Sequence, residues 1–319
     1  MLRAALGLGL LGYILSRSGV RAALSPVWSA PWVLAVLVGL SVFGASIEAE
    51  RLRVLFRAAG LRLTWLGAYR IVPVSTFFNF CIPGGTGGDV VKLYYLALDN
   101  RRRGLETATV MLADRAIALF AVLLFVLGMM GVNRAMVAGN AVLRGLLVVV
   151  LGAIVVIGVV AALSWSRRLR ESRVYARLLA RLPLRRYVER VADAVHEFRG
   201  RKRAVLAALL LSLAGHVGVA ATHVVVASVV IPGAPWQHVA FLSMVGMVAN
   251  AVPVTPGGLG VGEAAFAQLF GMMGYTGGAA LLILWRVGML PLALLGATIY
   301  ITGLAGRRLR VAEQATEAS

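Results

Sequence analysis

Four long apolar stretches constrain most strongly what this chain can fold into. They are residues 105–131, 141–163, 204–231 and 279–303. About 20 apolar residues in a helix cross the hydrocarbon core of a bilayer, and each stretch reaches that length. None of them alternates apolar and polar residues, as membrane β-strands do. Together with the shorter stretches 4–15 and 32–49, they predict an all-α, polytopic integral membrane protein with about six spans.

Composition favours a membrane protein over a soluble enzyme or a nucleic-acid-binding protein. Charged residues make up only 14% of the chain, whereas they are about a quarter of a soluble protein. The net charge of +19 comes from basic residues in the gaps between apolar stretches, and no nucleic-acid-binding motif accompanies it. The single cysteine, Cys81, excludes an intrachain disulfide and a cysteine-based metal site. We therefore expect no metal, no cofactor and no nucleic-acid partner.

Clusters of basic residues predict the orientation in the membrane. By the positive-inside rule, the cytoplasmic segments are residues 50–62, 101–104, 164–203 and 306–319. Residues 232–236 and 274–278 then face outward. This topology predicts an inner (cytoplasmic) membrane protein with both termini in the cytoplasm. Residues 1–15 also resemble a signal peptide, an alternative to an uncleaved first span that the sequence leaves open.

Two further apolar segments are broken by proline and glycine. Segment 63–100 lies between two basic clusters, so both of its ends should be cytoplasmic, and residues 83–88 interrupt it. Segment 236–275 lies between two spans whose facing ends are outside, and residues 253–260 interrupt it. We predict that they form two re-entrant hairpins, which enter the membrane from opposite faces.

The two hairpins carry similar motifs in the same order. The first contains Asn79, Pro83, Gly84, Gly85, Gly87, Gly88 and Asp89, and the second contains Asn250, Pro256, Gly257, Gly258, Gly260 and Glu263. An arginine follows in the next span of each half, Arg115 or Arg286. Similar motifs entering from opposite faces indicate an inverted repeat, with halves of about 1–131 and 141–303 in a single transmembrane domain, 1–319. We expect the motifs to meet near mid-membrane.

The polar segments carry less information. Apolar residues at helical spacing in the basic segment 164–203 predict one or two amphipathic helices on the cytoplasmic leaflet, with a solvated basic loop as the alternative. The tail 311–319 is predicted to be disordered. Glu48 and Glu50 stand beside arginines at the end of a span and are expected only to mark the membrane interface.

Charged residues inside apolar stretches are the sharpest functional signal. They are Asp89, Lys92, Asp114, Arg115, Glu263 and Arg286. Charge inside a bilayer is costly and is usually retained for function. Lys92 can pair with Asp89 one turn away, and Arg115 and Arg286 can neutralise Asp89 and Glu263 or bind a lipid phosphate. The alternative is a set of structural ion pairs.

The glycine motifs add a second candidate for anion binding. A glycine-rich loop that opens a helix exposes backbone N–H groups, and the helix dipole favours a phosphate there. The alternative is that the glycines serve only tight turns and close helix packing. No nucleotide-binding loop or nucleophile motif is present, so we do not expect an enzyme.

These motifs resemble those of a known family. The segments Ile82-Pro83-Gly84-Gly85-Thr86-Gly87-Gly88-Asp89 with Lys92, Asp114-Arg115, and Pro256-Gly257-Gly258-Leu259-Gly260-Val261-Gly262-Glu263 with Arg286 are similar to the lysylphosphatidylglycerol synthase transmembrane-region family, also described as flippase-like domains. The resemblance covers nearly the whole chain. Lys92 stands where the family pattern leads us to expect arginine. Larger members carry a synthetase domain after the membrane part, and we expect no such activity here.

The resemblance implies a lipid flippase or transporter that moves a phospholipid or a lipid-linked headgroup between leaflets. The partners it implies are membrane lipids, anionic or phosphate-bearing, with a homo-oligomer or a lipid-synthesising enzyme as further candidates. The other hypothesis is a non-transporting partner or scaffold for a lipid-modifying enzyme. The sequence leaves open which lipid moves, in which direction, and what drives the movement.

Overall fold

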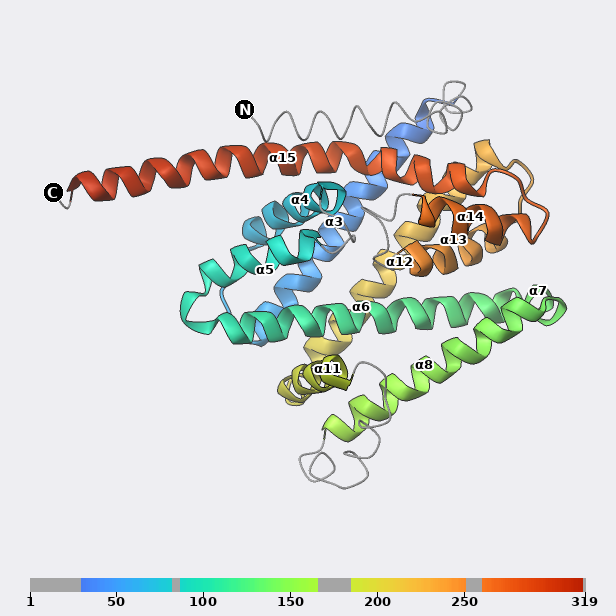
Figure 1. Cartoon of the computed structure of the whole chain (residues 1–319), viewed down its shortest axis with the longest axis horizontal. Helices are drawn as coiled ribbons and strands as arrows, with labels where there is room; N and C mark the ends of the chain where they lie inside the picture. Colours follow the sequence, from blue (N-terminus) through green and yellow to red (C-terminus); the bar gives the residue numbers. More distant parts are fainter. Residues whose placement is uncertain (1–29, 82–86, 166–184, 251–259, 318–319) are drawn as a thin grey trace.

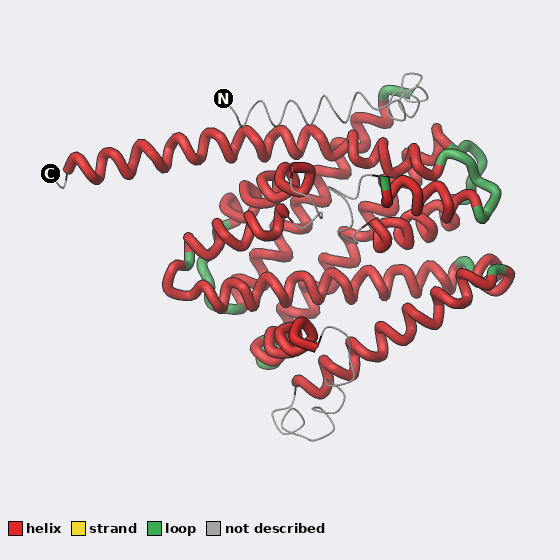
Figure 2. The backbone as a smooth tube through the Cα atoms, in the orientation of Figure 1, coloured by secondary structure: helices red, strands yellow, loops and turns green. Residues whose placement is uncertain are grey.

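The structure is a computed structural model that describes residues 30–81, 87–165, 185–250 and 260–317. Within these ranges every regular element is a helix, as Figure 2 shows. Five helices are long and apolar enough to cross a membrane. They are α3 (Trp32–Ala58), α6 (Gly104–Val132), α8 (Ala141–Trp165), α12 (Lys202–Val230) and α15 (Gly278–Glu317). The predicted all-α, polytopic membrane fold is therefore confirmed, while the proposed sixth span, 4–15, lies outside the described residues.

Four shorter helices form the two hairpins. They are α4 (Trp65–Cys81), α5 (Gly87–Asp99), α13 (Trp236–Asn250) and α14 (Val261–Gly271). At 1.5 Å per residue they are about 16 to 26 Å long, less than the hydrocarbon core of about 30 Å. The remaining elements are η1 (Arg101–Arg103), α7 (Arg134–Gly139) and α11 (Arg185–Glu197). The tips of both hairpins, 82–86 and 251–259, lie outside the described residues.

Helix packing divides the bundle into two equivalent halves. The first half is α3–α4–α5–α6 and the second is α12–α13–α14–α15. Every close pair of helices among these eight has a counterpart when the halves are exchanged. The packing of α4 on α15 corresponds to the packing of α13 on α6. The packing of α3 on α15 corresponds to the packing of α12 on α6. The pair α3–α12 is its own counterpart and forms the centre of the bundle.

The halves run in opposite directions. Along α3 and α12, Ile47 lies against Gly215 and Phe43 against Gly218, so the two helices are antiparallel. Helix α6 runs from α5 toward α7, and α15 runs the other way across the view in Figure 1. Opposed halves with matching contacts are the packing pattern of an inverted repeat.

The hairpins are tied at opposite ends of the bundle. At one end, the Asn100 side chain accepts a hydrogen bond from the Arg62 N–H at 3.2 Å, joining the start of the α4–α5 segment to its finish. At the other end, His238 Nδ1 lies 2.7 Å from the Tyr275 hydroxyl and closes the α13–α14 segment in the same way. Each hairpin therefore begins and ends on one side of the bundle.

Close backbone contacts hold the first hairpin against the last span. A Cβ at Gly296 of α15 would stand 1.9 Å from the Pro73 carbonyl oxygen of α4, so only glycine fits at that crossing. Four residues further along α15, the Tyr300 ring packs edge-on against Phe78 at 4.9 Å between ring centroids. Helix α8 is more peripheral. It packs on α6, α7 and α11 and exposes seven large apolar side chains, Val142, Val148, Val149, Leu151, Val155, Val156 and Val159.

Two predicted boundaries differ from the structure. Helix α3 continues through the charged residues to Ala58, beyond the predicted 32–49, because its charged side chains find partners on neighbouring helices. Helix α15 extends to Glu317, into the tail 311–319 for which disorder was predicted. That tail contains alanine, glutamate and glutamine, which favour helix. Between the end of α8 and the start of α12, the described part of segment 164–203 contains one helix, α11, within the predicted one or two.

Candidate functional site

The first candidate cluster begins where α5 starts. The Gly88 N–H donates a hydrogen bond to Asn79 Oδ1 at 2.9 Å, joining the first turn of α5 to the last turn of α4. A Cβ at Gly88 would stand 2.1 Å from the Ser75 carbonyl oxygen, so a larger residue would push the helices apart. This close approach places Asp89 in the first turn of α5, where the helix dipole favours a negative charge.

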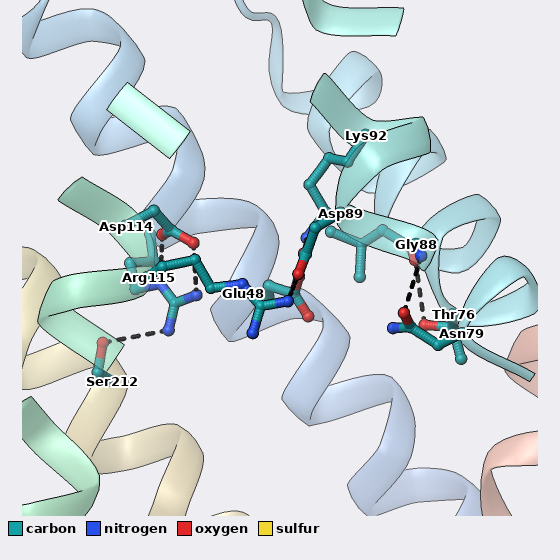
Figure 3. A network of polar contacts seen from close by, with 11 residues as sticks. Glu48, Thr76, Asn79, Gly88, Asp89, Lys92, Asp114, Arg115 and Ser212 are labelled. Carbon is teal, nitrogen blue, oxygen red and sulfur yellow. Dashed lines mark hydrogen bonds and ion pairs between the residues drawn. The ribbon is translucent and has the colours of Figure 1, made fainter. Parts of the chain in front are cut away.

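Ion pairs connect Asp89 to two other helices. Its carboxylate pairs with the Arg115 guanidinium of α6 and lies 3.7 Å from Lys92 Nζ. Lys92 is nearly buried, with 3% of its side chain exposed, and pairs with Glu48 of α3. Figure 3 shows these side chains pointing toward one another from α3, α5 and α6. Arg115, with 48% of its side chain exposed, is the most accessible cation of the cluster.

A second ion pair adjoins the first. Arg51 of α3 donates from Nε and Nη2 to the two oxygens of Asp114, at 2.7 and 2.9 Å. Its remaining terminal nitrogen donates to Ser212 Oγ of α12 at 3.2 Å. Both charged groups are largely buried. Arg51 therefore joins α3, α6 and α12 through a forked contact, the geometry that guanidinium and carboxylate groups favour.

The second candidate cluster lies at the start of α14. Glu263 Oε2 accepts the Gly260 N–H at 2.7 Å, and Oε1 lies 3.4 Å from Arg286 Nη1 of α15. Arg286 also donates to Asn250 Oδ1, at the end of α13, at 2.8 Å. A Cβ at Gly262 would stand 2.2 Å from that same oxygen. Only 6% of the Arg286 side chain is exposed.

The clusters repeat one arrangement. In each, an asparagine lies in the last turn of the first hairpin helix, and a glycine in the first turn of the second helix packs against it. An acid one residue later pairs with an arginine of the following span. Arg115 follows Asn79 by 36 positions, and Arg286 follows Asn250 by 36. They differ in exposure, since Arg115 is half-exposed and Arg286 is buried.

The structure brings together most of the predicted site residues that it describes. The predicted pairings of Asp89 with Lys92 and Arg115, and of Glu263 with Arg286, are present. Gly87 is buried at the start of α5. Six predicted residues lie outside the described residues: Pro83, Gly84, Gly85, Pro256, Gly257 and Gly258.

Sequence reasoning missed two members of the first cluster. Glu48 was expected only to mark the interface, but it binds Lys92. Arg51 was counted as a topology signal, but it binds Asp114. The missed signal is their spacing of three residues, which places both on one face of α3.

Formal charges balance in both clusters. Glu48, Asp89 and Asp114 offset Arg51, Lys92 and Arg115, and Glu263 offsets Arg286. An anionic group that binds Arg115 or Arg286 therefore competes with the carboxylate already paired with it. In the described part of the chain, no group of three or more His, Cys, Asp or Glu side chains is placed to hold a metal ion.

Comparison with known proteins identifies the family. Residues 1–296 match the family model described as "Lysylphosphatidylglycerol synthase TM region". No curated protein and no solved structure matches the chain. The family is a membrane domain linked to lipid modification or flipping, and the match covers both hairpins and both clusters. The chain therefore belongs to the lysylphosphatidylglycerol synthase transmembrane-region family, as its two glycine motifs predict.

Proposed function

We propose that this protein is a lipid flippase that moves a phospholipid or lipid-linked headgroup between the leaflets of the cytoplasmic membrane. The observation that carries the proposal is the repeated arrangement of asparagine, glycine, acid and arginine at the starts of α5 and α14. Family membership supports a lipid as the substrate. Short, broken helices that carry a charged site in each half of an inverted repeat are a recurrent architecture of membrane transporters.

The ion pairs suggest how a headgroup is handled. A phosphate that crosses the bilayer needs compensating positive charge throughout. In the resting cluster, Arg115 is engaged by Asp89, and its half-exposed side chain is the first cation that a phosphate meets. The phosphate displaces Asp89 from Arg115, and Lys92, 3.7 Å from Asp89, keeps the released carboxylate neutralised. Glu263 and Arg286 perform the same exchange in the second half.

The remaining features of the proposal follow from this exchange. The positive ends of the α5 and α14 dipoles add favourable potential at the same positions. The substrates are anionic or phosphate-bearing membrane lipids, and the protein performs no covalent chemistry on them.

Reconstitution of the purified protein tests the proposal. Liposomes of phosphatidylglycerol and phosphatidylethanolamine receive a trace of fluorescent NBD-phosphatidylglycerol, and dithionite quenches the probe in the outer leaflet. We expect the wild-type protein to make the inner-leaflet probe accessible, and the variants Arg115→Gln, Asp89→Asn, Arg286→Gln and Glu263→Gln to slow this exchange by at least about tenfold, since each loses a charged contact in the crossing path.

Two controls make the result decisive. Arg134→Gln removes an exposed arginine of α7 that lies outside both clusters, and it should translocate the probe at the wild-type rate. Thermal unfolding in detergent identifies variants that fail to fold. Folded wild-type protein that leaves the probe in its leaflet would overturn the flippase proposal and favour a scaffold for a lipid-modifying enzyme.

A further inference from the structure

The residue immediately before each site arginine is held from the first helix of its own half. Asp114 precedes Arg115 on α6 and is bound by Arg51 of α3. Trp285 precedes Arg286 on α15 and stacks on His223 of α12. Helices α3 and α12 correspond when the halves are exchanged, and so do α6 and α15. The two contacts therefore occupy equivalent places although their chemistry differs.

The first contact is ionic and directional. Two parallel hydrogen bonds, at 2.7 and 2.9 Å, fix both oxygens of Asp114 against the Arg51 guanidinium. Ser212 of α12 fixes the third arm of the fork at 3.2 Å. The Ser212 hydroxyl itself donates to the Ala208 carbonyl at 2.8 Å, so it is locked in place. A forked contact locked from both sides leaves Asp114 little freedom to rotate about the axis of α6.

The second contact is aromatic. The His223 ring is fully buried between Trp285 and Phe266, at centroid distances of 6.2 and 5.5 Å and interplanar angles of 17° and 29°. Its Nδ1 lies 2.9 Å from the Val219 carbonyl oxygen and donates to it, which fixes the ring on α12. Phe266 stands one turn after Glu263 on α14. His223 thus touches the neighbours of both members of the Glu263–Arg286 pair.

These contacts set the rotation of the two spans. Consecutive residues on a helix project about 100° apart, so locking residue 114 or 285 fixes the direction of the arginine that follows. Arg115 then faces Asp89 of α5, and Arg286 faces Glu263 of α14. A side chain that is turned away from its acid cannot exchange that acid for a phosphate.

We propose that Arg51 and His223 are equivalent positioning residues, which aim Arg115 and Arg286 at their acids by holding Asp114 and Trp285. The inference rests on the proposed flippase function and adds to that site two residues that position its arginines. It assigns one role to two residues of unlike chemistry, because the bundle places them at matching points of its two halves.

Double-variant cycles in the liposome assay with NBD-phosphatidylglycerol test the proposal. Arg51→Gln and His223→Ala should each slow translocation about tenfold, because small misplacements of a charged group are costly. Arg115→Lys and Arg286→Lys, which keep the charge and lose the fork, should also slow it. If Arg51 acts through Arg115, Arg51→Gln should slow an Arg115→Lys protein no further, and His223→Ala should likewise add nothing to Arg286→Lys.

A conservative replacement and a matched control separate positioning from folding. His223→Phe keeps a flat ring between Trp285 and Phe266 and should translocate within about twofold of wild type, since stacking is the contact that matters. Arg53→Gln, on α3 beside Glu50 and away from Asp114, should leave the rate unchanged.

Two results would overturn the inference while leaving the flippase proposal standing. One is an Arg51→Gln protein with a lowered unfolding temperature but wild-type translocation in its folded fraction. Arg51 would then serve only the stability of the fold. The other is a double variant in which the two losses multiply. If the lysine and glutamine variants of Arg115 and Arg286 all translocate the probe at the wild-type rate, these arginines do not handle the headgroup. Both proposals then fail.

Discussion

Gly262 lies directly against the side chain of Asn250, with space for a hydrogen but not for a methyl group. A Cβ there would stand 2.2 Å from Asn250 Oδ1 and 2.8 Å from a Leu282 methyl carbon. Asn250 Oδ1 meanwhile accepts a hydrogen bond from Arg286. The glycine thus lets one asparagine oxygen serve a close helix crossing and a buried arginine together. Gly88 makes the corresponding close approach in the first half, where Asn79 Oδ1 accepts the Gly88 N–H.

This contact predicts that alanine is not tolerated at these positions. Gly262→Ala should destabilise the protein by about 1–3 kcal/mol through overpacking, and Gly88→Ala should do the same where its Cβ meets the Ser75 carbonyl oxygen. Thermal unfolding in detergent measures both. Gly271→Ala is the matched control, because a Cβ at that end of α14 meets nothing within 4 Å. Equal unfolding temperatures for Gly262→Ala and Gly271→Ala would contradict the crossing described here.

The forked Arg51–Asp114 pair predicts a large penalty for removing one partner alone. Asp114→Asn leaves a largely buried guanidinium without its counter-ion, and we expect a loss of about 3–5 kcal/mol. Arg51→Met combined with Asp114→Leu should recover much of that stability, because no buried charge remains. Glu106→Gln is the control variant. It breaks the half-exposed ion pair with Arg103 and should lower the free energy of unfolding by less than about 1 kcal/mol. A double variant less stable than Asp114→Asn would count against this view.

The crossing of α4 and α15 predicts a third sensitive position. Gly296→Ala should separate Gly296 from Pro73 and weaken the Phe78–Tyr300 contact one turn away. We expect a loss of about 1–3 kcal/mol in the free energy of unfolding. Gly303→Ala, further along the same helix, meets nothing within 4 Å and should be neutral. If both variants unfold at the same temperature, α15 does not hold the first hairpin.

The tied ends of the hairpins predict the labelling pattern of single cysteines. In a Cys81→Ser background, Arg62→Cys and Arg102→Cys should react with a membrane-impermeant thiol reagent only from the cytoplasmic side. Pro232→Cys and Thr276→Cys should react only from outside. All four positions are exposed in the structure. Labelling of residues 62 and 102 from opposite sides would mean that α4–α5 crosses the membrane, and the re-entrant assignment would be wrong.

Much of the fold could be predicted because membrane insertion is read from short, local signals. Apolar length identified the spans, and proline and glycine between residues 83 and 88 marked the break between α4 and α5. The partners of Asp89 and Glu263 could also be predicted, because few charges occur inside apolar stretches and opposite charges there must pair.

Other partners could not be found from local signals. Lys92 was assigned to Asp89, three residues away, but its shorter contact is with Glu48, 44 residues earlier on another helix. Arg51 looked like one more arginine at a span end, because the sequence alone does not show that α3 continues to Ala58. The Asp89–Lys92 pairing is present, and the two missed contacts, with Glu48 and Asp114, concern long-range packing, which no motif spacing encodes. The role of Trp285 was equally hidden, because it depends on a stack with His223 from another helix.

The contact between Gly296 and Pro73 also has a consequence for biogenesis. A nascent chain emerges from the ribosome beginning with its N-terminus, so α4 enters the membrane more than 200 residues before the helix that packs against it. During that interval the face of α4 that will receive α15 meets lipid or the insertion machinery. Helix α5, the second helix of the same hairpin, carries Asp89 and Lys92 and is also made long before α15. Helix α15 therefore completes the packing of the first hairpin, and a ribosome that stalls before residue 278 leaves α4 without the helix that packs on it.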